Sequence, residues 1–119
     1  MARWEIVVTD EFARWYDTLE DDQADALDAR VELLREFGPA LGRPTVDRIA
    51  GSRVHNLKEL RIRSGGELRI LFAFDPGRRA VLLVGGDKTG RWQAWYDEAI
   101  PRAEQLFEQH LRSSHEDLG

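Results

Sequence analysis

The sequence predicts an α+β fold, in which a small twisted antiparallel sheet carries helices packed on one face. Three patterns support this: an alternating run at the N-terminus, two amphipathic stripes in residues 10–38, and three strand-like runs separated by tight turns in residues 53–84. A further helical stripe follows near the C-terminus. Because helical runs and strand runs are segregated, the expected order of elements is β-α-α-β-β-β-α.

The first strand and the two helices follow from the N-terminal third. Residues 3–9 are expected to form a strand with Trp4, Ile6 and Val8 on one face and Val7 on the other, and Thr9 or Asp10 can cap the next helix. The acidic cluster at residues 20–22 favours a second helix N-terminus, and Gly38 followed by Pro39 ends that helix. The stripes of the two helices are Phe12, Trp15, Tyr16 and Leu19, and then Ala24, Leu27, Val31 and Leu34. Residues 38–53 are rich in glycine and proline and are expected to form a loop with at most a short turn.

Three strands are expected at residues 53–62, 68–74 and 80–84. The turns between them, at residues 64–66 and 75–78, are short, so the strands form an antiparallel meander. The third strand is apolar on both faces, which is typical of a central or helix-covered strand. Residues 85–90 are then expected to form a loop.

The C-terminal helix completes one domain at residues 1–112, and residues 113–119 are expected to form a polar tail. A chain of 119 residues can bury one core but not two independent ones. The buried stripe of this helix contains Ile100, Ala103, Leu106, Phe107, His110 and Leu111.

The composition excludes several classes of protein. With no cysteine the chain has no disulfide, no thiolate nucleophile and no cysteine-bound zinc, so the cytoplasm is the expected compartment. The longest apolar run, residues 80–84, is far short of the ~20 residues that span a bilayer, and no apolar leader segment is evident at the N-terminus. The spacing of His55, His110 and His115 fits no metal-binding motif, so no metal or other cofactor is expected. Residues 85–90 contain glycines and Lys88 but lack the spacing of a nucleotide-binding P-loop, which leaves at most a weak anion site.

Charge is distributed unevenly along the chain. The net charge is −5, but residues 43–91 carry +6, whereas residues 1–42 carry −7 and residues 92–119 carry −4. A basic middle segment between acidic ends indicates a local anion site, and coincidental surface charge is the alternative.

The basic side chains of the middle segment are expected to gather on the sheet. Alternation puts Glu59, Arg61 and Arg63 on one face and Lys58 on the other, and Arg69 of the next strand can lie beside Arg61 or Arg63. Clustered arginines repel each other unless an anion or Glu59 neutralises them, which points to a phosphate-binding face. The alternative is a solvated cross-strand salt bridge of Glu59.

The lysines and aromatic residues add to this pattern. Fifteen of the seventeen basic residues are arginine, and both lysines, Lys58 and Lys88, fall in the basic segment. Trp92, Trp95 and Tyr96 follow Lys88 closely, and aromatic side chains beside cations can stack on RNA bases. The alternative is that these side chains pack the last helix onto the sheet.

Taken as a set, five segments resemble the RelE/HigB superfamily of toxins, and most closely its phage-derived HigB-like branch. The segments are Gly42–Pro44, Leu57–Arg61, Arg69–Leu71, Leu82–Lys88 and Ile100–Ala103. The resemblance implies a RelE-like fold and a bacterial toxin of a type II toxin–antitoxin pair. Such toxins are metal-independent, ribosome-dependent mRNA endoribonucleases that inhibit translation, by attack of a ribose 2′-OH on the adjacent phosphate.

The resemblance also implies site residues. Lys58 and Arg61 would hold the phosphate, Arg69 would neutralise the transition state, and Lys88 matches the basic residue after the last strand. Glu59 is a candidate general base or an orienting partner of Arg61, and Tyr96 is a candidate for the C-terminal catalytic position. The expected RNA-binding residues are Arg53, His55, Arg63, Arg91 and Trp92.

The resemblance implies as partners a cognate helix-turn-helix antitoxin, the ribosome and mRNA, with DNA contacted only through the antitoxin and no membrane contact. Two other functions remain open from the sequence. One is a non-catalytic module of the same fold that binds the antitoxin and contributes to operator autorepression, and the other is an anion-binding domain outside the family.

Overall fold

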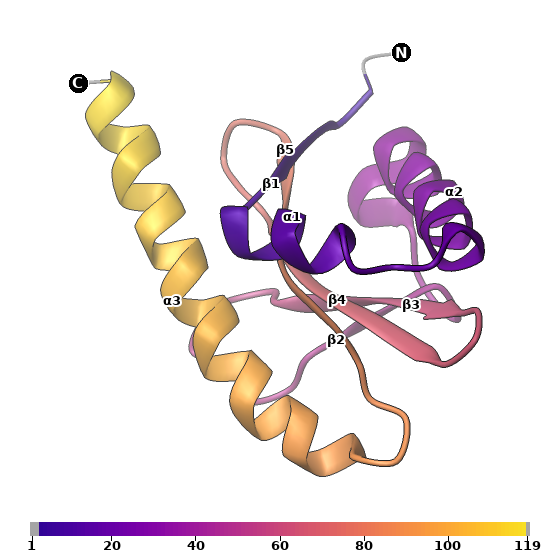
Figure 1. Ribbon diagram of the computed structural model, residues 1–119. Coiled ribbons are helices and arrows are strands. Elements are labelled where there is room, and N and C mark those ends of the chain that lie inside the picture. The colour runs from indigo at the N-terminus through magenta and orange to yellow at the C-terminus, as the bar shows by residue number, and fades with distance from the viewer. Residues whose placement is uncertain (1–2, 119) are drawn as a thin grey trace.

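A five-stranded sheet lies between two helical layers in the computed structural model, which describes residues 3–118 (Figure 1). The strand order is β1-β5-β4-β3-β2. The predicted α+β class is confirmed. The elements are β1 (Glu5–Val8), α1 (Asp10–Tyr16), α2 (Asp21–Phe37), the 3-10 turn η1 (Gly38–Ala40), β2 (Val46–Arg48), β3 (Lys58–Arg63), β4 (Glu67–Phe74), β5 (Arg79–Asp87) and α3 (Trp92–Leu118).

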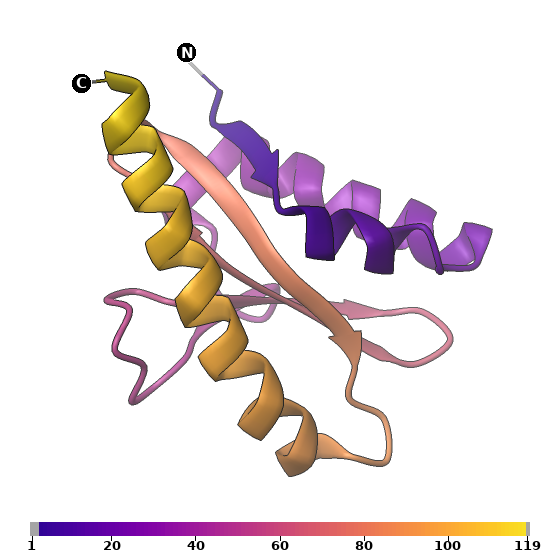
Figure 2. The same cartoon turned by 60° about the vertical axis from the view of Figure 1, so that its left-hand side comes forward.

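Helices cover both faces of the sheet, so the expectation of one covered and one open face is wrong. The helices α1 and α2 pack on one face, and α3 runs across the other (Figure 2). The reason is that β4 and β5 are apolar on both faces, and each face must be removed from water. The first core contains Phe12, Leu27, Leu34, Leu60, Ile70, Phe72 and Leu82, and the second contains Leu57, Leu71, Val81, Leu83, Trp95, Ala103 and Phe107.

The sheet is mixed rather than purely antiparallel. Strands β3, β4 and β5 form the expected antiparallel meander, but β1 pairs parallel with β5, with Ile6 opposite Ala80. Turn length determined the direction only of the three strands that tight turns connect. The long helical connection after β1 leaves its direction unrestricted, so the sequence pattern did not predict this parallel pairing.

Strand β2 lies within the segment that was expected to be a loop. Its three residues pair antiparallel with β3, with Val46 opposite Leu60 and Asp47 opposite Glu59. A three-residue edge strand is too short to show a periodic pattern, and neighbouring Pro44 and Gly51 made this segment resemble a loop. The consequence is that Asp47 lies beside the predicted phosphate-binding face.

Strand β5 is longer than predicted because Gly85 and Gly86 continue it instead of forming a loop. A Cβ atom on Gly85 would lie 2.2 Å from the Trp15 ring, and one on Gly86 would lie 2.1 Å from the indole nitrogen of Trp95. The absence of side chains therefore lets one tryptophan from each helical layer pack directly on the strand.

The helix ends agree with the predicted signals at two positions. Thr9 caps α1, its hydroxyl accepting a hydrogen bond from the backbone N–H of Phe12 at 3.0 Å, and Gly38 ends α2 with a φ of 56°. Helix α3 extends through residues 113–118, the greater part of the expected polar tail, and Gly119 lies outside the described residues. Within residues 3–118 no helix has both the length and the apolar composition required to cross a bilayer.

Candidate functional site

Glu59 is the centre of a polar cluster on the sheet face covered by α3. Its carboxylate is buried, and the side chain is 6% exposed. Arg61 Nε donates to Glu59 Oε1 at 3.0 Å, and the Tyr96 hydroxyl donates to Oε2 at 2.5 Å. Arg69 Nε lies 4.0 Å from the same Oε2 atom. With Lys88, these four residues form what we call the Glu59 cluster.

Sheet register and the start of α3 bring these side chains together. Arg61 and Arg69 are directly opposite each other on β3 and β4, so their positive charges would repel without a carboxylate between them. Glu59 supplies that carboxylate, and Asp47 of β2 accepts a second hydrogen bond from Arg61 Nη2 at 3.0 Å. Sequence reasoning missed Asp47 because its strand gave no periodic signal.

Arg69 has an unused hydrogen-bond donor in a buried position. The residue is 5% exposed, and its Nη1 donates to the backbone oxygen of Leu68 at 2.9 Å. Its Nε, by contrast, has no hydrogen-bond partner within the described part of the chain. A buried donor without a partner costs about 1–3 kcal/mol, so the fold maintains Arg69 here at the expense of stability. Such a donor is available to an incoming anionic oxygen.

Lys88 is held by aromatic rings. Its Nζ lies 5.1 Å from the ring centre of Trp92 and 5.6 Å from that of Tyr96, and the residue is 8% exposed. Burial lowers the pKa of the Lys88 ammonium, and the nearby Arg69 guanidinium lowers it further. No hydrogen bond or ion pair of this ammonium is found among the side chains that the structure describes. The carboxylates of Glu67 and Glu59 act on the ammonium without an ion pair, so a phosphate oxygen would meet a cation with no direct acidic partner in the described region.

Tyr96 is a phenol that stays protonated over the physiological range. Burial raises its pKa to about 12, and the hydrogen bond to the Glu59 carboxylate contributes to the shift. The side chain therefore acts as a hydrogen-bond donor at neutral pH.

We expect spectrophotometric titration at alkaline pH to detect this environment. The chain has two tyrosines, and a hydrogen bond to Asp28 also raises the pKa of Tyr16, so phenolate absorbance is expected to develop above pH 10. In Tyr96→Phe the component with a pKa of about 12 should disappear. Glu59→Gln should lower that pKa, because the neutral amide removes the charge. A Tyr96 pKa near 10 in the native chain would contradict the assigned contact.

The structure separates Lys58 from the cluster. Its position on β3 turns it to the opposite face, where its Nζ lies 5.4 Å from the ring centre of Phe74. Burial lowers the pKa of Lys58, and the Arg48 guanidinium adds to this effect. Of the six predicted catalytic residues, the structure brings together Glu59, Arg61, Arg69, Lys88 and Tyr96.

The predicted RNA-binding residues are dispersed. Trp92 is 56% exposed and adjoins the cluster through Lys88, and Arg63 follows Arg61 on the same strand face. Arg91 pairs with Glu98. Arg53 is bound to Glu104 and Glu108 of α3, and His55 lies in the loop between β2 and β3, beside a separate pocket.

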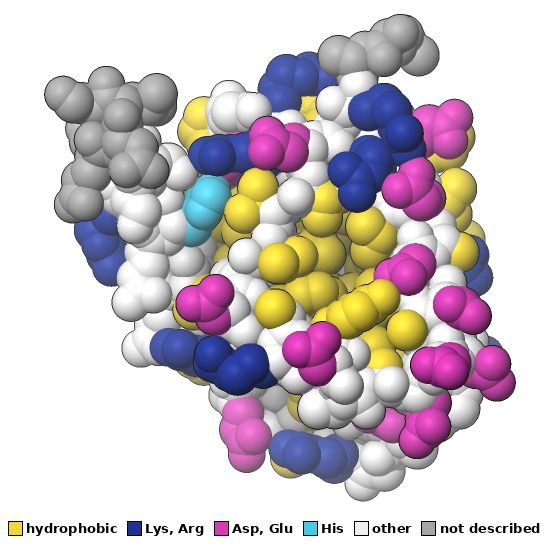
Figure 3. All heavy atoms as spheres, turned by 45° about the horizontal axis from the view of Figure 1, so that its top comes forward, with side chains coloured by type: hydrophobic (Ala, Val, Ile, Leu, Met, Phe, Trp, Pro, Cys, Tyr) yellow, Lys and Arg dark blue, Asp and Glu magenta, His cyan; other side chains and the backbone are white. Residues whose placement is uncertain are grey.

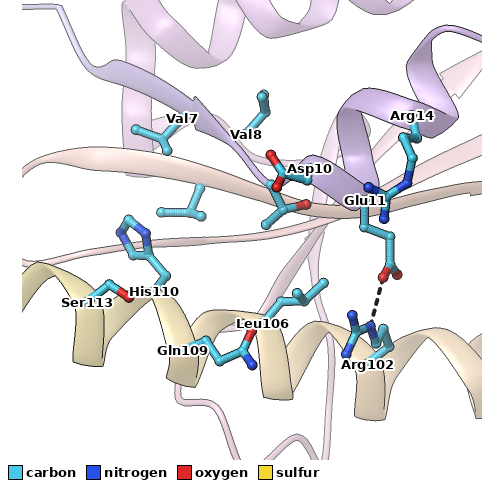
Figure 4. A pocket seen from close by; sticks show the side chains of 12 residues that line it. Val7, Val8, Asp10, Glu11, Arg14, Arg102, Leu106, Gln109, His110 and Ser113 are labelled. Atoms are coloured by element: carbon cyan, nitrogen blue, oxygen red, sulfur yellow. Dashed lines mark hydrogen bonds and ion pairs between the residues drawn. The ribbon is translucent and has the colours of Figure 1, made fainter.

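A groove of about 440 Å³ lies elsewhere, between β1, α1 and α3 (Figure 4). Glu11 and Arg102 form an ion pair of 2.8 Å across it. Hydrophobic side chains gather on this side of the molecule, with charged side chains around them (Figure 3). The groove contains no convergent set of cations comparable to the Glu59 cluster. The described residues include no group of three or more His, Asp or Glu side chains placed to bind a metal ion.

Comparisons with known proteins agree with this architecture. The family model described as "Phage derived protein Gp49-like" matches residues 14–108. Two proteins of Mycobacterium tuberculosis are similar in sequence. "Putative toxin HigB3" is 46% identical over 110 residues, 92% of this chain and 96% of that protein. "Putative toxin HigB2" is 48% identical over 104 residues, 86% of this chain and 52% of that longer protein.

A solved structure shares the fold. A mutant of the E. coli toxin RelE in the free state superposes with a TM-score of 0.63 at 13% identity, covering 84% of this chain and 97% of that one. The resemblance to RelE/HigB-type toxins expected from the sequence is thereby confirmed. Because the family model matches most of the residues and a 46% identical relative aligns along nearly its whole length, the chain belongs to the Gp49-like family of phage-derived proteins.

Proposed function

We propose that this protein is the toxin of a type II toxin–antitoxin pair and that it cleaves mRNA on the ribosome without a metal ion. Support comes from relatives that are named as HigB toxins and from the RelE-like fold. The observation that carries the proposal is the convergence of Arg61, Arg69 and Lys88 around the Glu59 carboxylate and the Tyr96 hydroxyl.

The chemistry required is transfer of a phosphodiester to a neighbouring hydroxyl. A bond forms between phosphorus and the ribose 2′ oxygen, and the bond from phosphorus to the 5′ oxygen breaks. Negative charge develops on the non-bridging oxygens, and buried cations stabilise such charge best. Arg69, with its unused Nε donor, and Lys88 supply these cations.

Two protons must also move. Glu59 is the candidate base that takes the proton of the 2′-OH, and Tyr96 is the candidate acid that protonates the leaving 5′ oxygen. The 2.5 Å hydrogen bond between them then provides a route by which the Glu59 proton returns to Tyr96. Each group ends in its starting state, so the proton balance closes without a metal or other cofactor.

The partner in this proposal is a helix-turn-helix antitoxin, through which any contact with operator DNA is made. The protein acts in the cytoplasm, where ribosomes and mRNA are found. A non-catalytic antitoxin-binding module is the competing proposal, and it requires no convergence of cations around Glu59.

Primer extension on translated mRNA tests the proposal. The native chain should produce ribosome-dependent stops, and Lys88→Ala should reduce their yield by about a hundredfold because one cation is lost from the transition state. Lys58→Ala is the matched control, since Lys58 lies on the other face, and we expect it to retain cleavage.

Two outcomes count against the proposal. If the folded native chain yields no ribosome-dependent stops, the enzyme is excluded and the antitoxin-binding module is favoured. If Lys58→Ala impairs cleavage more than Lys88→Ala, the active site lies on the opposite face from the Glu59 cluster.

A further inference from the structure

A second cavity adjoins the Glu59 cluster at the edge of β3 that β2 leaves uncovered. Its volume is about 390 Å³, and it is lined by Arg30, Pro44, Thr45, Arg61, Arg63 and Arg69. We infer that this four-arginine cavity binds an RNA phosphate next to the one that is cleaved, and that Arg30 of α2 is a phosphate-binding residue. The identity of the polymer rests on the proposed function, whereas the anion site itself does not.

The four arginines of the cavity differ in how far carboxylates compensate their charge: Arg61 pairs with Glu59 and Asp47, whereas Arg30 and Arg63 lack a close partner in the described chain. None of its lining residues is acidic. Arg30 is exposed and has no hydrogen bond or ion pair among the described residues, and Arg63 has only a solvent-exposed contact of 3.7 Å with Glu67. Guanidinium groups that outnumber the carboxylates beside them repel each other, and a bound anion relieves this repulsion.

Arg69 indicates a ligand at the wall that the cavity shares with the Glu59 cluster. Its side chain is 6% exposed, it lines the cavity, and its Nε lacks a hydrogen-bond partner in the described chain. Leaving a buried charged group partly unsatisfied is costly, and a bound anion would complete the hydrogen bonding of this guanidinium.

Phosphate fits this space better than an isolated carboxylate. Arg61 and Arg69 belong both to the cavity and to the Glu59 cluster, so a ligand that fills the two places must carry closely spaced anionic groups. A nucleic-acid backbone has one phosphate in each repeat, and the planar arginine fork donates two hydrogen bonds to phosphate. Arg30 then extends the RNA path from the sheet to α2, a contact that no sequence motif predicts.

Calorimetric titration with inorganic tripolyphosphate tests the anion site without any cleavage step. We expect Arg30→Ala and Arg63→Ala each to weaken tripolyphosphate binding by about tenfold, as loss of a charged hydrogen bond predicts. Both side chains are exposed, so the variants should fold normally. Arg14→Ala, at an exposed arginine of α1 beside the other groove, makes the same charge change and should leave the affinity within about twofold of native.

Binding of a non-cleavable, 2′-O-methylated RNA tests the polymer. The slope of log affinity against log salt should fall by about 0.7 in Arg30→Ala, the value for one single-strand phosphate contact, and should not change in Arg14→Ala. If Arg30→Ala weakens tripolyphosphate binding no more than Arg14→Ala does, the anion site is overturned. If the salt slope of RNA binding is unchanged in Arg30→Ala, the assignment of the ligand as RNA is overturned. Tighter binding of a pentaglutamate peptide than of tripolyphosphate assigns the cavity to an acidic protein segment instead. If tripolyphosphate binding depends on Arg30 but the protein does not cleave mRNA, the anion site is supported and the proposed function fails.

Discussion

Arg69→Ala is expected to reduce ribosome-dependent mRNA cleavage by about a thousandfold, the effect of removing a donor that stabilises developing charge. The same substitution is expected to leave the protein as stable as before. It removes a buried Nε that lacks a hydrogen-bond partner in the described chain. It also ends the repulsion between Arg61 and Arg69, which lie opposite each other on β3 and β4. The lost packing of the side chain offsets this gain, whereas Glu59 keeps its hydrogen bonds to Arg61 and Tyr96.

Single-turnover cleavage and thermal unfolding, measured on the same preparations, separate the two effects. Arg69→Lys keeps the charge but loses the planar fork, so its cleavage rate should fall between those of the native chain and Arg69→Ala. Arg112→Ala, at an exposed arginine of α3, controls for net charge. Cleavage by Arg69→Ala at the native rate would show that the transition-state charge is neutralised elsewhere. A large loss of thermal stability would show that Arg69 is mainly structural.

The part of the candidate site on the sheet was predictable because it depends on local geometry. Side chains alternate along a strand, which places Glu59 and Arg61 on one face, and a tight turn brings Arg69 opposite Arg61. The same alternation puts Lys58 on the other face. Including Lys58 in the site relied on matching a family position, whereas the structure places Lys58 on the opposite face from the Glu59 cluster.

The rest of the site depends on contacts between distant segments. Tyr96 reaches Glu59 only because α3 crosses the face that was expected to be open, and this placement follows from the apolar character of both faces of β4 and β5. Asp47 reaches Arg61 through a three-residue strand, and β1 joins the sheet through a connection that does not determine its direction. These features depend on the packing arrangement that buries the most apolar surface. A short stretch of sequence does not predict that arrangement.

Asp75→Ala is expected to destabilise the fold by about 3 kcal/mol, the lower end of the cost of removing one partner of a buried charge pair. The Asp75 side chain is 1% exposed and joins the β4–β5 turn to α3. Its Oδ1 accepts from the backbone N–H groups of Gly77 and Arg79 at 2.9 and 3.1 Å. Its Oδ2 is 2.8 Å from Arg79 Nε and 2.7 Å from His110 Nε2. Removing the carboxylate leaves all four groups without this acceptor.

The pH dependence of stability identifies the carboxylate charge as the cause. Burial alone would raise the pKa of Asp75, but its hydrogen bonds to His110 and Arg79 outweigh burial and lower that pKa. A carboxylate with a lowered folded-state pKa stabilises the fold above its ordinary pKa of about 4 and loses this effect as the pH falls through the folded value. In urea unfolding, the difference in free energy of unfolding between the native chain and Asp75→Ala should therefore be largest at neutral pH and decrease at acidic pH. Asp25→Ala, at an exposed position of α2, should show no such difference. If the loss of stability in Asp75→Ala stayed constant down to low pH, Asp75 would stabilise the fold through packing rather than through its charge.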